Sequence, residues 1–123
     1  MPDWLLAWRA PALVFLGGGS GAVARYWIGR GLAVPGGFPW PTFGINVAGS
    51  FALGILAVLC KDRPGWFLLL GTGVCGGFTT FSTFSVEALR MLEADEYGSA
   101  TGYVCGSVAA AIVGAWLGMS ALR

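Results

Sequence analysis

The sequence carries few side chains that could do chemistry, and the most informative of them is an amide. Asn46 lies in an apolar stretch, residues 43–60, that contains no charge before its end. An amide inside an apolar helix is costly unless it is partnered, and its NH₂ group can donate two hydrogen bonds. A small, strongly hydrated anion needs such donors when it loses its water. An interhelical hydrogen bond explains the residue equally well, so Asn46 alone leaves both interpretations open.

Two aromatic rings lie at helical spacing further along the chain. Phe81 and Phe84 are three residues apart and so share a helical face, with Ser82, Thr83 and Glu87 nearby. A phenyl ring has a positive edge, and edges turned toward a pore would weakly stabilise a bare anion without holding it too tightly to leave. Taken alone, two phenylalanines in an apolar helix also serve as ordinary packing residues.

Hydroxyl donors recur on the last apolar stretch. Tyr103 and Ser107 are four residues apart, which places them on one face of a helix. No Asp or Glu lies at the centre of any apolar stretch, and Glu87 falls near an end. A proton-coupled cation transporter normally needs a carboxylate at the centre of a span. The pattern therefore favours a path for an anion or a neutral solute.

Four apolar stretches must position these residues. Apolar residues make up 56% of the 123-residue chain and charged residues only 11%, a balance far from that of a soluble domain. A soluble protein of this size cannot bury so much apolar surface, whereas a helix of about 20 apolar residues crosses a bilayer. We therefore predict an all-α membrane protein, a single domain over residues 1–123. Its four transmembrane helices are expected at about residues 10–29, 43–60, 66–92 and 101–122.

The third stretch is longer than a span requires and contains adjacent glycines, Gly76 and Gly77, followed by Thr79 and Thr80. Paired glycines weaken a helix and β-branched residues do not restore it, so we predict a break near 76–80, at mid-membrane. Carbonyls freed at that depth need water, protein or a cation. Two breaks facing each other across a dimer would offer a cage of oxygens suited to Na⁺. The alternative is a plain kink whose carbonyls bond the threonine hydroxyls.

The positive charges give little orientation bias. Four basic residues fall on one side of the predicted spans and three on the other: Arg9, Lys61, Arg63 and Arg123 against Arg25, Arg30 and Arg90. This near balance predicts dual topology, in which identical chains insert in both orientations and opposite copies pair. A fixed orientation set by one or two dominant charges is the alternative. Four thin helices have little room for a pore of their own, so we expect a homodimer.

Other function classes lack the residues they require. The seven Lys and Arg nearly balance the six Asp and Glu, so nothing in the sequence attracts nucleic acid. Without histidine or paired carboxylates there is no general acid or base to name, and we expect no enzyme activity. The three cysteines, Cys60, Cys75 and Cys105, are far apart in apolar runs, which predicts neither a disulfide framework nor a zinc site.

Three segments of the sequence resemble the Fluc/CrcB family of fluoride channels. They are GGGSGAVARYW at 17–27, PTFGINVAGSFALG at 41–54 and GVCGGFTTFSTFSVE at 73–87, the last being highly specific to that family. The match extends over almost the whole chain. The resemblance implies a fluoride-selective channel that exports cytoplasmic fluoride passively through a bacterial inner membrane. It also implies an antiparallel homodimer with two pores and a central structural Na⁺.

The resemblance gives the candidate residues their roles. Asn46 is similar to the pore asparagine that contacts the anion, and Phe81 and Phe84 resemble an aromatic pair whose ring edges face it. The remaining anion-pore positions carry hydroxyls or a carboxylate: Ser82, Thr83, Glu87, Tyr103 and Ser107.

Three further positions are implied outside the anion path itself. The backbone carbonyls of Gly76 and Thr79, two from each subunit, match those that hold the Na⁺. Arg25 matches an arginine of the first helix whose role is structural or vestibular. Ala111 replaces a hydroxyl that some relatives carry one turn past Ser107, which leaves the detail of one vestibule open.

Two other interpretations fit the architecture less well. A small-multidrug-type antiporter shares the length, span count and dual topology, but it needs a membrane carboxylate, usually in the first span. Residues 10–29 contain none. A scaffold subunit would explain the many glycines, yet it gives no reason for polar donors on three different helices. A fluoride channel is therefore the favoured interpretation.

Overall fold

The computed structural model describes residues 3–123, apart from the side chains of residues 4–6, and within that part of the chain it contains helices and no strand. The elements in chain order are α1 (Asp3–Leu32), α2 (Trp40–Leu59), α3 (Pro64–Trp66), η1 (Phe67–Cys75), α4 (Gly76–Phe78), α5 (Phe81–Glu93) and α6 (Tyr97–Ser120). η1 is a π-helix and the others are α-helices. The prediction of an all-helical fold is confirmed.

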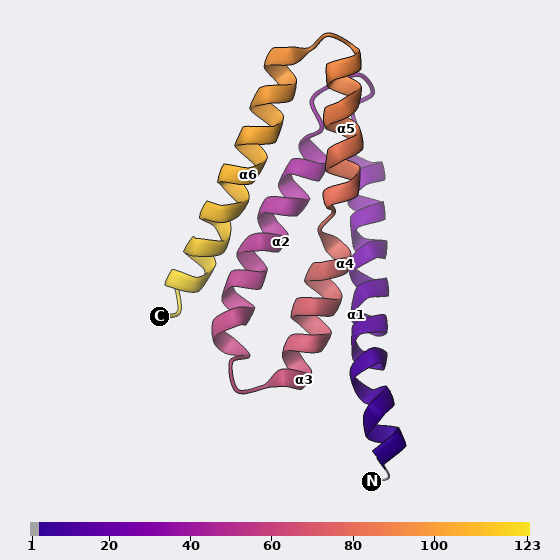
Figure 1. Ribbon diagram of the computed structural model, residues 1–123, viewed down its shortest axis with the longest axis vertical. Coiled ribbons are helices and arrows are strands. Elements are labelled where there is room, and N and C mark those ends of the chain that lie inside the picture. Colours follow the sequence, from indigo (N-terminus) through magenta and orange to yellow (C-terminus); the bar gives the residue numbers. More distant parts are fainter. Residues whose placement is uncertain (1–2) are drawn as a thin grey trace.

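The helices lie side by side and run alternately up and down (Figure 1). α1 rises from the N-terminus, α2 descends, the segment from α3 to α5 rises and α6 descends, so both ends of the chain lie at the same end of the molecule. α2 packs mainly on α6, whereas α1 packs mainly on η1 and α4. The broken third segment is therefore held between α1 on one side and α2 on the other.

Three helical segments of the described residues are long and apolar enough to cross a membrane. They are Trp40–Leu59, Pro64–Glu93 and Tyr97–Ser120, with mean hydropathies between 1.3 and 1.9. Each extends beyond the predicted span at its N-terminal end, because Trp40, Pro64 and Tyr97 already lie in the first helical turn. α1 is 30 residues long but is not among the three. A fourth span therefore stays a prediction.

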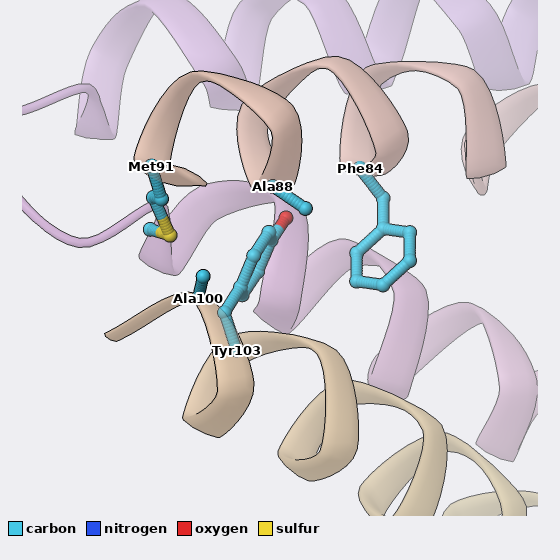
Figure 2. Close-up of a cluster of buried hydrophobic side chains, with 5 residues drawn as sticks. All are labelled: Phe84, Ala88, Met91, Ala100 and Tyr103. Carbon is cyan, nitrogen blue, oxygen red and sulfur yellow. The ribbon is translucent and has the colours of Figure 1, made fainter. Parts of the chain in front are cut away.

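The outer surface of the molecule is its most apolar part. Phe15 is 80% exposed, Trp27 68% and Ile112 64%. The main buried cluster is small and lies where α5 meets α6 (Figure 2); its members are Phe84, Ala88, Met91, Ala100 and Tyr103. In water such an exterior would be a large exposed apolar surface, whereas lipid solvates it. The molecule is a multi-pass membrane protein.

Glycines bring α1 and the third segment into contact backbone to backbone. A methyl group on Gly17 would overlap the Leu69 carbonyl oxygen, and one on Gly21 would overlap that of Val74. No larger residue fits at these positions, so the helices approach as closely as small-residue membrane interfaces allow. This contact brings Arg25, one turn beyond Gly21, against the end of α4.

The third segment is interrupted inside the predicted range. Thr79 and Thr80 adopt extended backbone angles, with φ −80° and ψ 154° for the first and φ −148° and ψ 117° for the second. Thr80 then caps α5, because its side-chain oxygen accepts the Thr83 N–H at 3.2 Å. The predicted break near 76–80 is confirmed as two extended residues close to the middle of Pro64–Glu93.

Candidate functional site

The break is held open by a side chain of α2. The Asn46 Oδ1 atom accepts the Thr80 N–H at 2.8 Å, and Asn46 Nδ2 donates to the Thr80 carbonyl at 3.0 Å. One amide thus satisfies both backbone groups of a residue that has left the helix. This is the interhelical hydrogen bond left open above, and it uses only one of the two Nδ2 hydrogens.

The hydrogen bonds around the break leave particular carbonyls without their helical donors. In an uninterrupted helix the Thr80 N–H would reach the Gly76 carbonyl and the Thr83 N–H would reach that of Thr79. Both donors are diverted, the first to Asn46 and the second to the Thr80 hydroxyl. Only the Gly77 carbonyl gains a replacement from outside the segment, because Arg25 Nε donates to it at 3.1 Å. The break also carries the Ser82 N–H away from the Phe78 carbonyl, so the carbonyl oxygens of Gly76, Phe78 and Thr79 all lose their helical donors.

A cavity of about 270 Å³ lies beside the break, between α2, α5 and α6. Its lining is mostly apolar, with polar residues among it, and comes from four helical elements and the break: Asn46, Gly49, Ser50, Leu53, Cys75, Thr79, Thr80, Phe81, Phe84, Ser107, Val108 and Ala111. The Ser107 hydroxyl is buried and has no hydrogen-bond partner among the described residues. A buried hydroxyl without a partner is costly, so this cavity is suited to a solute that accepts a hydrogen bond.

The two aromatic rings of the cavity lie next to each other, but one is buried and the other is exposed. The ring centroids of Phe81 and Phe84 are 5.6 Å apart, with an angle of 43° between the ring planes. Phe84 is 7% exposed, whereas Phe81 is 78% exposed. We expected the rings to share a helical face. They do touch, but only Phe84 turns into the protomer.

A carboxylate joins three helices next to this cavity. The Thr42 hydroxyl donates to Glu87 Oε1 at 2.8 Å, and the Tyr103 hydroxyl donates to Oε2 at 2.6 Å. Tyr103 is fully buried, and its ring stands between α6 and α5 with the hydroxyl pointing toward α5 (Figure 2). It contacts the Phe84 ring with centroids 5.0 Å apart. The predicted pore hydroxyl of Tyr103 is therefore occupied by Glu87.

A second cavity, of about 690 Å³, opens between the C-terminal end of α1, the loop at 33–39, α2 and α5. Arginines and acidic residues both line it, including Arg25, Arg30, Arg90 and Glu87. Thr80 lines both this cavity and the smaller one. Thr80 is therefore the residue that the linings of the two cavities share, at the break.

The structure separates the predicted site residues into three groups. The smaller cavity brings together Asn46, Thr79, Phe81, Phe84 and Ser107, and Ala111 lies there too. The larger cavity has Arg25, Thr83 and Glu87 in its lining. Neither cavity is lined by Gly76, Ser82 or Tyr103. Gly76 and Ser82 are exposed on the protomer, and the Ser82 hydroxyl lies 3.3 Å from that of Thr80.

Two residues that form hydrogen bonds at the candidate site, Thr42 and Thr80, were not among the predicted site residues, and one had a detectable pattern. Thr42, Asn46 and Ser50 are spaced four residues apart, so they form a polar stripe along α2. Thr42 could have been found from that spacing. Thr80 had no comparable pattern, because its importance lies in backbone groups that the break releases.

The fold defines a helical membrane protein with two cavities beside a break in its third helical segment. A family model described as "CrcB-like protein, Camphor Resistance (CrcB)" matches residues 12–119, and the chain belongs to this family.

Three similar bacterial proteins share one name. The chain is 42% identical to "Fluoride-specific ion channel FluC" of Gloeobacter violaceus, over 94% of this chain and 97% of the relative. It is 46% identical to the protein of that name in Novosphingobium aromaticivorans, over 93% and 96% of the two chains. The identity to that of Oceanobacillus iheyensis is 48%, over 90% and 89%.

Proposed function

We propose that this protein is a fluoride-selective ion channel that lets fluoride leave the cytoplasm passively. The relatives that match nearly its whole length are named fluoride-specific ion channels, and such proteins are not enzymes. The single structural observation that carries the proposal is the buried Ser107 hydroxyl without a partner, in a cavity that it shares with Asn46 and two phenyl rings. Fluoride enters cells as the weak acid HF and dissociates there, so a passive path outward lowers its toxicity.

The cavity offers an anion several weak contacts and no fixed cation. Ser107 can donate its hydroxyl hydrogen, Asn46 its second Nδ2 hydrogen, and Phe81 and Phe84 can present ring edges. Fluoride is small and binds hydrogen-bond donors strongly, so it gains more from these groups than chloride does. No Lys or Arg lines this cavity, and an ion is therefore not held too tightly to leave.

The larger cavity serves as the entrance. Arg30 and Arg90 supply positive charge there that attracts anions, and Thr83 and Glu87 line the same cavity. An anion that moves inward from here passes Thr80 to reach the smaller cavity. Ser82 and Tyr103 act beside this route, through Thr80 and Glu87 respectively.

The functional unit in this proposal is an antiparallel homodimer with two pores. Phe81 is 78% exposed although it lines the cavity, and Gly76 and Ser82 beside it are exposed too. Polar backbone and side chains at mid-membrane depth are costly against lipid, so a second copy covering this face would complete the cavity wall. The near balance of basic residues, four on one side of the predicted spans and three on the other, allows that copy to be inverted. A reporter fused to the C-terminus should be active on both sides of the membrane, and activity on one side only would contradict dual topology.

A structural Na⁺ at the dimer centre fits the free carbonyls. The Gly76 and Thr79 oxygens have lost their helical donors, and two such pairs from facing breaks would satisfy a hard monovalent cation. Such a cation would give these carbonyl oxygens the positively charged partner that lipid does not supply. The purified protein should therefore melt at a higher temperature in Na⁺ than in a bulky organic cation at equal ionic strength.

The transport mode is tested with liposomes that contain the purified protein and potassium fluoride. A passive channel should release fluoride only when valinomycin lets K⁺ carry the compensating charge, and it should need no gradient of protons or Na⁺. Fluoride release that depends on an imposed proton gradient would instead indicate an exchanger.

A further inference from the structure

One hydrogen bond at the break is made by a cationic side chain and has no role in the anion path described above. Arg25, from α1, donates its Nε hydrogen to the Gly77 carbonyl at 3.1 Å. In an uninterrupted helix that carbonyl would accept the N–H of Phe81, four residues on. The extended residues Thr79 and Thr80 carry Phe81 away, so Arg25 replaces the missing donor.

The break is thus held from both sides by different helices. Arg25 fixes the last turn before it, and Asn46 of α2 fixes Thr80 after it. We propose that Arg25 is a positioning residue of the pore, and that it acts through its Nε hydrogen bond to Gly77 and not through its charge. This inference rests on the proposed function only where it is tested by fluoride release, because the hydrogen-exchange test does not depend on transport.

Position and charge point to the same conclusion. The nitrogen in contact with the backbone is Nε, the guanidinium nitrogen nearest the chain, and Arg25 is also one of the residues that line the larger cavity. Arg30 and Arg90 line that cavity as well and supply positive charge there. Without Arg25, two arginines still line this cavity, together with Glu87 and Glu96. Removing the hydrogen bond would leave the Gly77 carbonyl without its replacement donor and would loosen the break, which borders the smaller cavity.

Three substitutions separate the hydrogen bond from the charge. In R25Q the amide nitrogen stands the same number of bonds from Cα as Arg Nε, so the donor is kept and the charge is lost. In R25K the charge is kept, but no nitrogen stands at that position. R25M removes both. The backbone contact is read by amide hydrogen exchange over residues 79–83, and pore function by fluoride release from liposomes.

If Arg25 acts through Nε, the amide hydrogens of residues 79–83 should exchange at the wild-type rate in R25Q. This variant should also keep at least half of the wild-type fluoride release. R25K and R25M should exchange at least tenfold faster over residues 79–83 and lose at least nine-tenths of the release. Retention in R25K with loss in R25Q would overturn the inference in favour of charge. Wild-type exchange in all three would overturn it as well.

A second pair of variants tests the same contact without touching Arg25. G21A should push α1 away from η1, because the added methyl would overlap the Val74 carbonyl, and its exchange over residues 79–83 should match that of R25M. G19A is the control, since a methyl there meets open space. Wild-type exchange in G21A would count against the inference.

If the wild type releases no fluoride, the proposed function fails, while the exchange comparison still decides the role of Arg25. If R25M does not fold, R25Q and R25K decide it.

Discussion

Asn46 and Thr80 are joined by two hydrogen bonds that use both polar atoms of one amide, at 2.8 Å and 3.0 Å. These two bonds satisfy the backbone N–H and carbonyl of Thr80 in the break of the third helical segment, and they connect the break to α2. They also leave one amide hydrogen for a solute in the smaller cavity. The same residue can therefore hold the pore wall and face the ion.

Replacing Asn46 by aspartate tests this double role. N46D keeps the size and the acceptor for the Thr80 N–H, but it sets a carboxylate oxygen against the Thr80 carbonyl. We expect a loss of about 1–3 kcal/mol in stability, because a buried carbonyl loses its donor. Fluoride release should fall at least tenfold. Thermal melting in detergent and liposome flux measure the two effects, and G44A on the same helix, in open space, is the control.

Ser107 should show opposite effects on stability and transport. S107A removes a buried hydroxyl that has no partner, so the free energy of unfolding should rise by up to about 1–3 kcal/mol. Fluoride release should nevertheless fall several-fold, because a donor to the ion is lost. S120A, at the exposed end of α6, should change neither quantity. Unchanged transport in S107A would show that the hydroxyl does not meet the anion.

The two phenylalanines should separate packing from transport. F84I removes a buried ring and should lower stability by about 1–3 kcal/mol as well as fluoride release. F81I alters a ring that is 78% exposed and should lower the release with little change in protomer stability. F15I is the matched control on α1, since Phe15 is 80% exposed and lines neither cavity. If F15I and F81I reduce flux equally, the ring edge of Phe81 has no specific role.

The Glu87 carboxylate should act as a structural acceptor for two hydroxyls. E87Q turns one acceptor oxygen into a donor, so Thr42 and Tyr103 cannot both keep their bonds. Stability should fall by about 1–3 kcal/mol, and Y103F combined with E87Q should cost less than the sum of the single changes. E93Q, exposed at the end of α5, is the control. Full additivity in the melting experiments would mean that the two groups do not interact.

The sequence predicted the elements better than the contacts. Four apolar stretches, the turns between them and the weak point at Gly76 and Gly77 follow from composition and local propensity, and helices are local structures. The π-helical winding of η1 was not foreseen, since it depends on packing against α1. Neither was the extent of α1 to Asp3, because Asp3, Arg9 and Pro11 interrupt the apolar residues there.

The candidate site was predicted in its residue types and only partly in its geometry. The family resemblance assigned Asn46, Phe84 and Ser107 to one anion path, and the three residues line one cavity. Helical spacing could not show that Tyr103 would be engaged by Glu87, because the two residues meet across helices. Nor could it show that Phe81 would point out of the protomer, since this depends on how α5 is turned after the break.

The central claim is that this cavity passes fluoride in preference to chloride, and paired flux from the same liposomes tests it most directly. With valinomycin present, liposomes that contain the protein should release fluoride rapidly and chloride scarcely above the leak of empty liposomes. Equal initial rates for the two halides, or no release of either, would contradict the account.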